Sequence, residues 1–426
     1  MSVTAIVGAN WGDEGKGKMT DFLAESSDIV IRFQGGSNAG HTIINKFGRF
    51  SLHLIPSGIF YSNVTNILGT GVAFNPEAFM NELNDLKKNG IKNPKILISD
   101  RAEVLLPYHV LFDCCEEERR GKKKQFGSTK SGIAPFYSDK YSKIGIQVAD
   151  LYNEDVLRSK INTALETKNV LLKYLYKKDE LNAKDIISKL LKEAEEIKPY
   201  VCNTSILLHK ALKEGKKLLV EGQLGALRDP DHGIYPFSTS SSTLAGYASV
   251  GAGIPPYEIK EIIAVVKAYS SCVGAGPFVT EIFGDEASEL RDRGGDKGEY
   301  GATTGRPRRM GWLDLVATKY GCMMQGATGI ALTLLDVLGY LDEIPVCTGY
   351  VVDGTITEDF PVTYKLTNAK PVYKKLKGWK SKLTGIHEFD KLPKEAKDYV
   401  KFIEDFTGVP VKWVSVGPRR EDTIER

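Results

Sequence analysis

The sequence contains little cysteine and no long apolar run, and both absences narrow the classes of protein to consider. Its six cysteines are spread over 426 residues, and no two of them form a C-x-x-C pair. A zinc cluster or a disulfide framework is therefore not indicated, and a reducing compartment is favoured, so we expect a cytoplasmic protein. No apolar stretch approaches the roughly 20 residues that a membrane span needs, and the first residues lack a signal-peptide pattern. We therefore expect no membrane partner.

The charges are nearly balanced, with 57 Lys and Arg against 54 Asp and Glu and a formal net charge of +3. This excess is too small to indicate a nucleic-acid partner. The basic run at residues 119–124 is typical of a solvated loop, and we expect no nucleic acid to bind there. With 42% hydrophobic and 26% charged residues, the composition is that of a globular protein with a large core.

Short apolar runs of strand length alternate with helical patterns along the chain. The predicted strands are residues 3–7, 28–33, 218–220, 262–266, 330–335 and 411–414. Helices are predicted at residues 19–25, from Asn75 to Gly90, and at residues 184–197. This alternation predicts an α/β protein with a large, mostly parallel central sheet flanked by helices. No linker is long enough to divide the chain, so we expect residues 1–426 to form one domain with peripheral helical and loop subregions.

The segment Gly12-Asp13-Glu14-Gly15-Lys16-Gly17-Lys18 lies between the first predicted strand and the first predicted helix. Its G-x-x-x-x-G-K spacing is that of a P-loop-like turn, in which glycines free backbone N–H groups for phosphate oxygens. Met19 follows where a P-loop has the Ser or Thr that binds magnesium. Asp13 beside phosphates would be repelled unless it bound a cation or exchanged a proton. We therefore interpret Asp13 as a metal ligand, a general base, or both.

Other predicted strands also end in glycine or polar residues, at 35–42, 221–223, 336 and 415–417. Ligands of parallel sheets bind at the carboxyl ends of strands, so we expect one shared cleft. His41 closes a glycine-rich turn there and could donate a proton or a hydrogen bond to a phosphoryl or carbonyl oxygen. The loop 302–309 has three arginines in four positions and is suited to binding carboxylates or phosphates.

Six motifs, in this order along the chain, resemble the adenylosuccinate synthetase family. They are WGDEGKGK at 11–18, GGSNAGHT at 35–42, EGQLGALRDPDHGIYP at 221–236, VGAGPF at 273–278, TTGRPRR at 303–309 and GWLD at 311–314. The resemblance spans essentially the whole chain. It implies a homodimeric, GTP-dependent ligase with one Mg²⁺ per subunit and with IMP, GTP and L-aspartate as substrates.

The resemblance also implies a two-step reaction. The 6-oxygen of IMP would attack the γ-phosphate of GTP, and the amino group of L-aspartate would then displace that phosphate. The products would be adenylosuccinate, GDP and phosphate, on the route to AMP. Asp13 would act as the base and His41 would stabilise the transferring phosphoryl group. Asp13 and the carbonyl of Gly40 would bind the magnesium ion.

Binding residues follow from the same resemblance. GTP would contact Gly12, Asp13, Glu14, Gly15, Lys16, Gly17, Lys18, Gly40, His41, Thr42, Arg308, Leu334, Leu335, Asp336, Ser415, Val416 and Gly417. IMP would contact Asp13, Glu14, Gly15, Lys16, Asn38, Ala39, Gly40, His41, Thr129, Lys143, Gln223, Thr239 and Arg306. L-Aspartate would contact Ala302, Thr303, Thr304, Gly305, Arg306, Pro307 and Arg308.

Several positions depart from the family's pattern. Leu334 stands where the family has a lysine beside the guanine, and Gln223 lies one residue earlier than the usual glutamine. Lys130 and Ser131 replace a glycine and an arginine, and Pro307 replaces an arginine of the 302–309 loop. Lys143 aligns with an arginine that reaches across the dimer to the IMP phosphate, and it keeps the charge without the fork-shaped donor group.

Two other functions remain open on the residues alone. A GTP-dependent switch protein would explain the phosphate-binding turn and Asp336, but not His41 or the arginine-rich loop. A kinase-type or ATP-grasp-like ligase acting on another acceptor would differ in its nucleotide preference and acceptor.

Overall fold

A ten-stranded sheet runs through the computed structural model, which describes residues 3–121, 125–301 and 305–426. Neighbouring strands of this sheet pair in parallel, except for the antiparallel pair β20 and β21 at one edge, whose bounds are given next. From one edge to the other the strands are β9 (Val201–Cys202), β7 (Ile96–Ser99), β5 (Thr65–Leu68), β2 (Ile29–Arg32), β10 (Leu218–Glu221), β1 (Val3–Gly8), β11 (Ile259–Lys267), β16 (Gly329–Thr333), β20 (Val411–Ser415) and β21 (Thr423–Glu425).

All six predicted strands lie in this sheet, so the predicted fold class is confirmed. One predicted boundary is wrong, because β16 ends at Thr333 although the apolar run continues to Leu335. Leu334 adopts a φ of 60°, in the left-handed region, and a strand cannot continue through that conformation. The chain therefore turns away from the sheet at Leu334, the first residue of the predicted guanine-binding segment.

Helices cover the sheet and extend beyond it at one side. Helix α2 confirms its prediction, because Asn75 Oδ1 accepts the Ala78 N–H at 3.0 Å and Pro76 is the first helical residue. The helices are α1 (Lys16–Ala24), α2 (Pro76–Lys88), α3 (Pro107–Arg120), α4 (Ile133–Tyr141), α5 (Glu154–Val170), α6 (Ala183–Ile197), α7 (Thr204–Lys213), α8 (Ala248–Ala252), α9 (Gly284–Arg293), α10 (Leu315–Gln325), α11 (Thr363–Leu366) and α12 (Lys394–Thr407).

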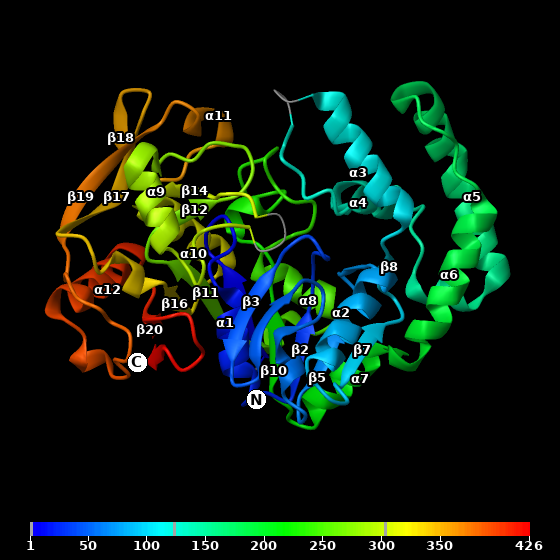
Figure 1. The fold of residues 1–426 in the computed structure, drawn as a ribbon, viewed down its shortest axis with the longest axis horizontal. Helices are drawn as coiled ribbons and strands as arrows, with labels where there is room; N and C mark the ends of the chain where they lie inside the picture. Colours follow the sequence, from blue (N-terminus) through cyan, green and yellow to red (C-terminus); the bar gives the residue numbers. More distant parts are fainter. Residues whose placement is uncertain (1–2, 122–124, 302–304) are drawn as a thin grey trace.

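The subregions lie on opposite sides of the molecule (Figure 1). Helices α3 to α6 occupy the right side of that view. A smaller sheet of β15 (Leu313–Asp314), β17 (Glu343–Val352), β18 (Thr355–Thr357) and β19 (Lys370–Lys377) occupies the left side together with α12. The central sheet and its carboxyl-end loops lie between them.

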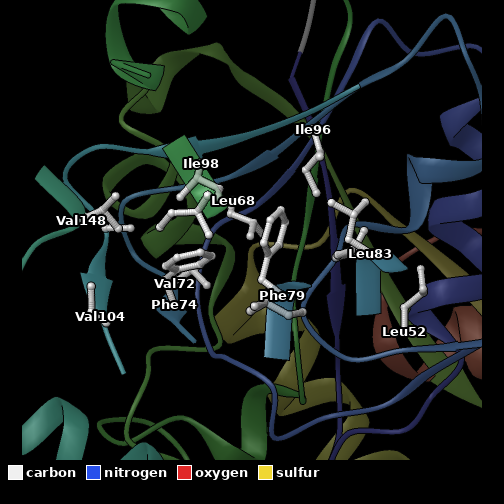
Figure 2. Close-up of a cluster of buried hydrophobic side chains, with 14 of the residues drawn as sticks. Leu52, Leu68, Val72, Phe74, Phe79, Leu83, Ile96, Ile98, Val104 and Val148 are labelled. Carbon is white, nitrogen blue, oxygen red and sulfur yellow. The ribbon is translucent and has the colours of Figure 1, made fainter. Parts of the chain in front are cut away.

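Part of the hydrophobic core is shown in Figure 2, where apolar side chains from strands and helices meet. Phe74 and Phe79 pack with ring centroids 5.6 Å apart, and Leu68, Leu83 and Ile98 surround them. All five side chains are buried. Each contributes roughly 1.5–3 kcal/mol by leaving water. This packing fixes β5 and β7, and with them the half of the sheet that carries β2.

Two small elements stand over the carboxyl end of the sheet. The hairpin of β3 (His41–Asn45) and β4 (Gly48–Leu52) begins with a predicted catalytic residue. A three-stranded sheet of β12 (Ser270–Cys272), β13 (Glu281–Ile282) and β14 (Arg309–Gly311) contains the end of the arginine-rich segment.

Candidate active site

The turn between β1 and α1 is folded around the side chain of Glu14. Its carboxylate accepts the N–H groups of Asn10 at 3.2 Å and Gly12 at 2.8 Å, and it pairs with Lys16 Nζ at 2.5 Å. Glu14 and Lys16 are both buried. Gly15 caps α1 with a φ of 94°, a conformation that favours glycine. Glu14 therefore fixes the shape of the phosphate-binding turn.

Asp13 is the acid of this turn that faces open space. Its side chain is 29% exposed, and its Oδ2 lies 3.1 Å from Arg308 Nε. Asp13 has a φ of 60°, in the left-handed region that few residues other than glycine, asparagine and aspartate adopt. The structure thus brings the predicted base of the first motif against an arginine of the predicted anion-binding loop.

Lys18 points to a different partner than its P-loop position predicts. Its Nζ donates to Ser415 Oγ at 2.6 Å and to the Gly417 carbonyl at 2.8 Å. Burial lowers the pKa of this ammonium to about 8, against the attraction of nearby carboxylates. Lys18 therefore joins two of the segments predicted to bind GTP, the phosphate-binding turn and the end of β20.

His41 is the first residue of β3, and Glu221 fixes its ring. Its Nδ1 lies 2.7 Å from Glu221 Oε1, and Glu221 also accepts the Ser57 N–H at 2.8 Å and the Ser57 hydroxyl at 2.5 Å. Burial and the charge of Arg32 lower the pKa of His41, while Glu221 opposes the shift. The neutral ring therefore donates through Nδ1 and presents Nε2, which has no hydrogen-bond partner within the described residues.

Gly17 is required for the close approach of this histidine to the turn. A Cβ atom at position 17 would lie 2.9 Å from His41 Cβ, closer than side chains tolerate. Gly17 of the first motif thus lets helix α1 approach His41 closely.

The carboxamide of Gln223 forms hydrogen bonds with other residues of the protein. Its Nε2 donates to the Gly36 carbonyl at 2.9 Å and to Asn38 Oδ1 at 3.0 Å, while its Oε1 accepts the Gly36 N–H at 3.1 Å. Gln223 is buried. It ties the end of β10 to the glycine-rich turn that leads to His41.

The segment predicted to bind guanine lies after β16. Asp336 has an Oδ1 atom that is buried with no hydrogen-bond partner among the described residues, and burial raises the pKa of its carboxyl group to about 6. Leu335 is fully buried, and Val416 is buried in the facing segment, where its N–H donates to the Asp422 carbonyl. Asp336 Oδ1 therefore has the capacity to accept a hydrogen bond from a bound base, as the predicted guanine-binding segment requires.

Arg308 and Arg309 of the 302–309 loop bind different partners in the structure. Arg308 Nη1 pairs with Glu299 Oε2 at 2.6 Å, whereas Arg309 pairs with Glu281, with Nε to Oε1 at 2.8 Å. Arg309 also donates to the carbonyls of Gly274 and Gly276. The donors of Arg309 therefore hold the 274–276 turn. That the 302–309 loop binds carboxylates or phosphates stays a prediction.

Asp13, Lys18, His41 and Arg308 line one cavity of about 430 Å³. Predicted residues that line it are Asp13, Glu14, Gly15, Lys16, Gly17, Lys18, Ala39, Gly40, His41, Thr42, Arg308, Leu334, Ser415 and Gly417. Arg49, Lys267 and Glu299 also line it and were not predicted. No motif marks these three, because each is a single charged residue whose position depends on tertiary packing.

Other predicted residues lie outside the lining of this cavity. Thr129, Lys143, Gly305, Arg306 and Pro307 are exposed, and Thr239 is partly buried. Gly12, Asn38, Gln223, Leu335, Asp336 and Val416 lie behind or beside the lining residues. The predicted aspartate-binding residues Ala302, Thr303 and Thr304 lie outside the described residues.

The part of the chain that the structure describes has no clustered metal ligands, no disulfide and no membrane-spanning helix. No group of three or more His, Cys, Asp or Glu side chains in it is arranged to hold a metal ion. All six cysteines are free thiols. Among residues 3–121, 125–301 and 305–426, no helix has the length and apolar character needed to cross a membrane.

A parallel sheet with a phosphate-binding turn, an acid and a histidine at one cavity defines a nucleotide-binding α/β enzyme. A sequence model of the adenylosuccinate synthetase family matches residues 5–424, and the chain belongs to that family. It is 47% identical to the adenylosuccinate synthetase of Caldanaerobacter subterraneus subsp. tengcongensis, over 100% of this chain and 99% of that one. It is 46% identical to that of Clostridioides difficile, with the same coverage. The fully ligated adenylosuccinate synthetase structure from Plasmodium falciparum matches with a TM-score of 0.92 and 35% identity, over all of both chains.

Proposed function

We propose that the 430 Å³ cavity is the place where this enzyme joins IMP to L-aspartate, with Asp13 and His41 as its catalytic residues. As a member of its family, the chain is a GTP-dependent C–N ligase that forms adenylosuccinate on the route to AMP. The observation that carries the assignment is the convergence of Asp13, His41 and the phosphate-binding turn on one cavity.

In the first step, Asp13 removes the proton from N1 of IMP. The electron pair then develops on the 6-oxygen, which forms a bond to the γ-phosphorus of GTP while the bond to the GDP oxygen breaks. Asp13 is suited to this role because its carboxylate is exposed to the cavity and is held at 3.1 Å by Arg308. A positioned base contributes on the order of 10²–10⁴-fold to such a step.

His41 acts on the phosphoryl group in transit. His41 lines the cavity, its Nε2 is buried without a hydrogen-bond partner among the described residues, and Glu221 fixes the ring through Nδ1. Negative phosphoryl oxygens near Nε2 favour the protonated ring, so the histidine can donate a hydrogen bond where charge develops. The carboxylate of Glu221 balances the resulting imidazolium.

In the second step, the amino group of L-aspartate attacks C6 and phosphate leaves with its bonding electrons. The amine loses a proton and the purine ring regains its aromatic form. We assign the carboxylates of L-aspartate to Arg308, Arg306 and the adjoining residues 302–307. A guanidinium binds a carboxylate with two parallel hydrogen bonds, which fixes the orientation of the amine.

The residues fit one magnesium ion. Asp13 presents a carboxylate oxygen and Gly40 lines the same cavity, and oxygen donors are the ligands that Mg²⁺ prefers. Two protein ligands suffice, since Mg²⁺ usually keeps waters and binds substrate phosphates. When bound, the ion would neutralise phosphate charge.

We assign the remaining substrate contacts by the order of the segments. GTP phosphates would lie against the N–H groups of Gly15 to Lys18 and of Gly40 to Thr42, and guanine would reach Asp336 and the end of β20. IMP would occupy the side of Asn38 and Thr239, with Thr129 and Lys143 near its phosphate. We further propose a homodimer in which Lys143 serves the partner's site, and a cytoplasmic location in keeping with six free thiols.

Phosphate release tests this function directly. The enzyme is incubated with IMP, GTP, Mg²⁺ and L-aspartate, and each component is omitted in turn. We expect phosphate release only in the complete mixture, and adenylosuccinate by mass spectrometry. Hydrolysis of GTP at the same rate without IMP and L-aspartate would instead indicate a switch-type GTPase.

A further inference from the structure

A buried group of alternating charges lies directly behind Asp13. Lys267 Nζ contacts Glu299 Oε1 at 2.7 Å, Glu299 Oε2 contacts Arg308 Nη1 at 2.6 Å, and Arg308 Nε lies 3.1 Å from Asp13 Oδ2. The side chains of Lys267 and Glu299 are 3% and 1% exposed. Two positive and two negative groups make this Lys267–Glu299–Arg308–Asp13 chain neutral as a whole.

Glu299 is the fixed member of this charge chain. Its Oε1 also accepts the hydroxyl of Tyr269 at 2.5 Å, and its backbone carbonyl accepts the Arg308 N–H at 2.9 Å. The two cations hold the pKa of this carboxyl group down at about 2 despite its complete burial. Both the backbone and the guanidinium of Arg308 are therefore bound to a single residue that cannot move far.

We propose that Glu299 is a positioning residue. It holds the guanidinium of Arg308 in place while that guanidinium releases Asp13 and binds an anionic group of a substrate. The inference rests on the proposed function of the cavity. Without its contact to Asp13, the group of Lys267, Glu299 and Arg308 carries one positive charge in total. A buried positive charge next to the cavity attracts a phosphate oxygen of GTP or a carboxylate of L-aspartate.

The alternative is a role in stability alone. A buried carboxylate between two cations contributes to folding, and its loss leaves Lys267 without an ionic partner and Arg308 with Asp13 alone. Substitution of Lys267 together with Glu299 distinguishes a role in stability from a role in positioning Arg308. Removing both buried charges of the Lys267–Glu299 pair relieves the folding defect but leaves Arg308 without its anchor.

The test compares Glu299→Gln, the double variant Lys267→Met with Glu299→Gln, and the control Glu281→Gln. Glu281 binds Arg309 by a similar two-point contact, and it does not line the cavity. KM for GTP, L-aspartate and IMP, kcat and the melting temperature are measured for each. We expect Glu299→Gln to raise KM for GTP or for L-aspartate about tenfold or more, the loss typical of a displaced charge-assisted hydrogen bond. Which of the two rises identifies the anion.

We further expect KM for IMP to change less than threefold. In the double variant the melting temperature should recover while the raised KM persists, and Glu281→Gln should show no selective rise. Equal changes for all three substrates, unchanged KM values, or recovery of KM together with stability would overturn the proposal. If Glu299→Gln does not fold, Glu299→Asp is measured by the same criteria. If the wild type releases phosphate without IMP or L-aspartate, the proposed function is refuted, whatever the KM values of the variants.

Discussion

Lowering the pH from 7 to 5 should weaken GTP binding about tenfold through the carboxyl group of Asp336. Burial raises the pKa of this group to about 6, and its Oδ1 has no hydrogen-bond partner among the described residues. Guanine presents two donors, N1–H and the 2-amino group, which need an ionised acceptor. A group of pKa about 6 is about ten-elevenths ionised at pH 7 and about one-eleventh ionised at pH 5. The ratio is roughly tenfold, or about 1.4 kcal/mol.

Calorimetric titration of GTP at pH 5, 6 and 7 measures this effect. GTP phosphates and Lys18 also titrate, so the matched control is Asp336→Asn, which keeps the size of the side chain and cannot ionise. The ratio of Kd values between wild type and variant should shrink as the pH falls. The variant should also bind XTP relatively better, because xanthine presents a carbonyl to the amide. A constant ratio from pH 5 to 7 would show that guanine is bound elsewhere.

Three further predictions concern single residues. Asp13→Ala should lower kcat at least about 100-fold with an unchanged far-UV circular dichroism spectrum, and activity within tenfold of wild type would contradict its role as base. His41→Asn keeps a donor but cannot become an imidazolium, so kcat should fall while the Kd for GTP stays within about threefold; the reverse result would make it a ground-state ligand. Lys143→Leu should raise KM for IMP alone, and mixing it with Asp13→Ala chains should restore part of the activity at low IMP. No recovery despite demonstrated subunit exchange would refute the cross-subunit role.

The sequence predicted the fold class and the centre of the site because both depend on local patterns. Apolar runs such as 3–7 and 218–220 become central strands, since a strand buried on both faces needs no alternation. Gly12 to Lys18 forms the predicted turn because glycine spacing directly determines backbone conformation there. The short strands β5, β7, β9 and β21 were not predicted, because their pairing depends on neighbours distant in the chain.

Side-chain partners were less predictable than segments. Lys18 has the sequence position of a phosphate-binding lysine, yet its ammonium contacts Ser415 and Gly417. Arg309 belongs to the same short motif as Arg308 but binds Glu281 on another face. Glu299 and Lys267 carry no motif at all, although they form the buried part of the charge chain. Such choices depend on which charge is within reach after folding.

The hydrogen bond from Lys18 to Ser415 spans 397 positions of the sequence. It joins the first loop of the chain to the last parallel strand, and β1 itself lies between β10 and β11, which are synthesised much later. The nucleotide-binding turn is therefore made early on the ribosome but receives its structural support only when synthesis is almost complete. Contacts of such long range slow folding, because much of the chain must be ordered before they form. A nascent chain that has not yet emerged to residue 415 holds the phosphate motif without the residue that binds Lys18.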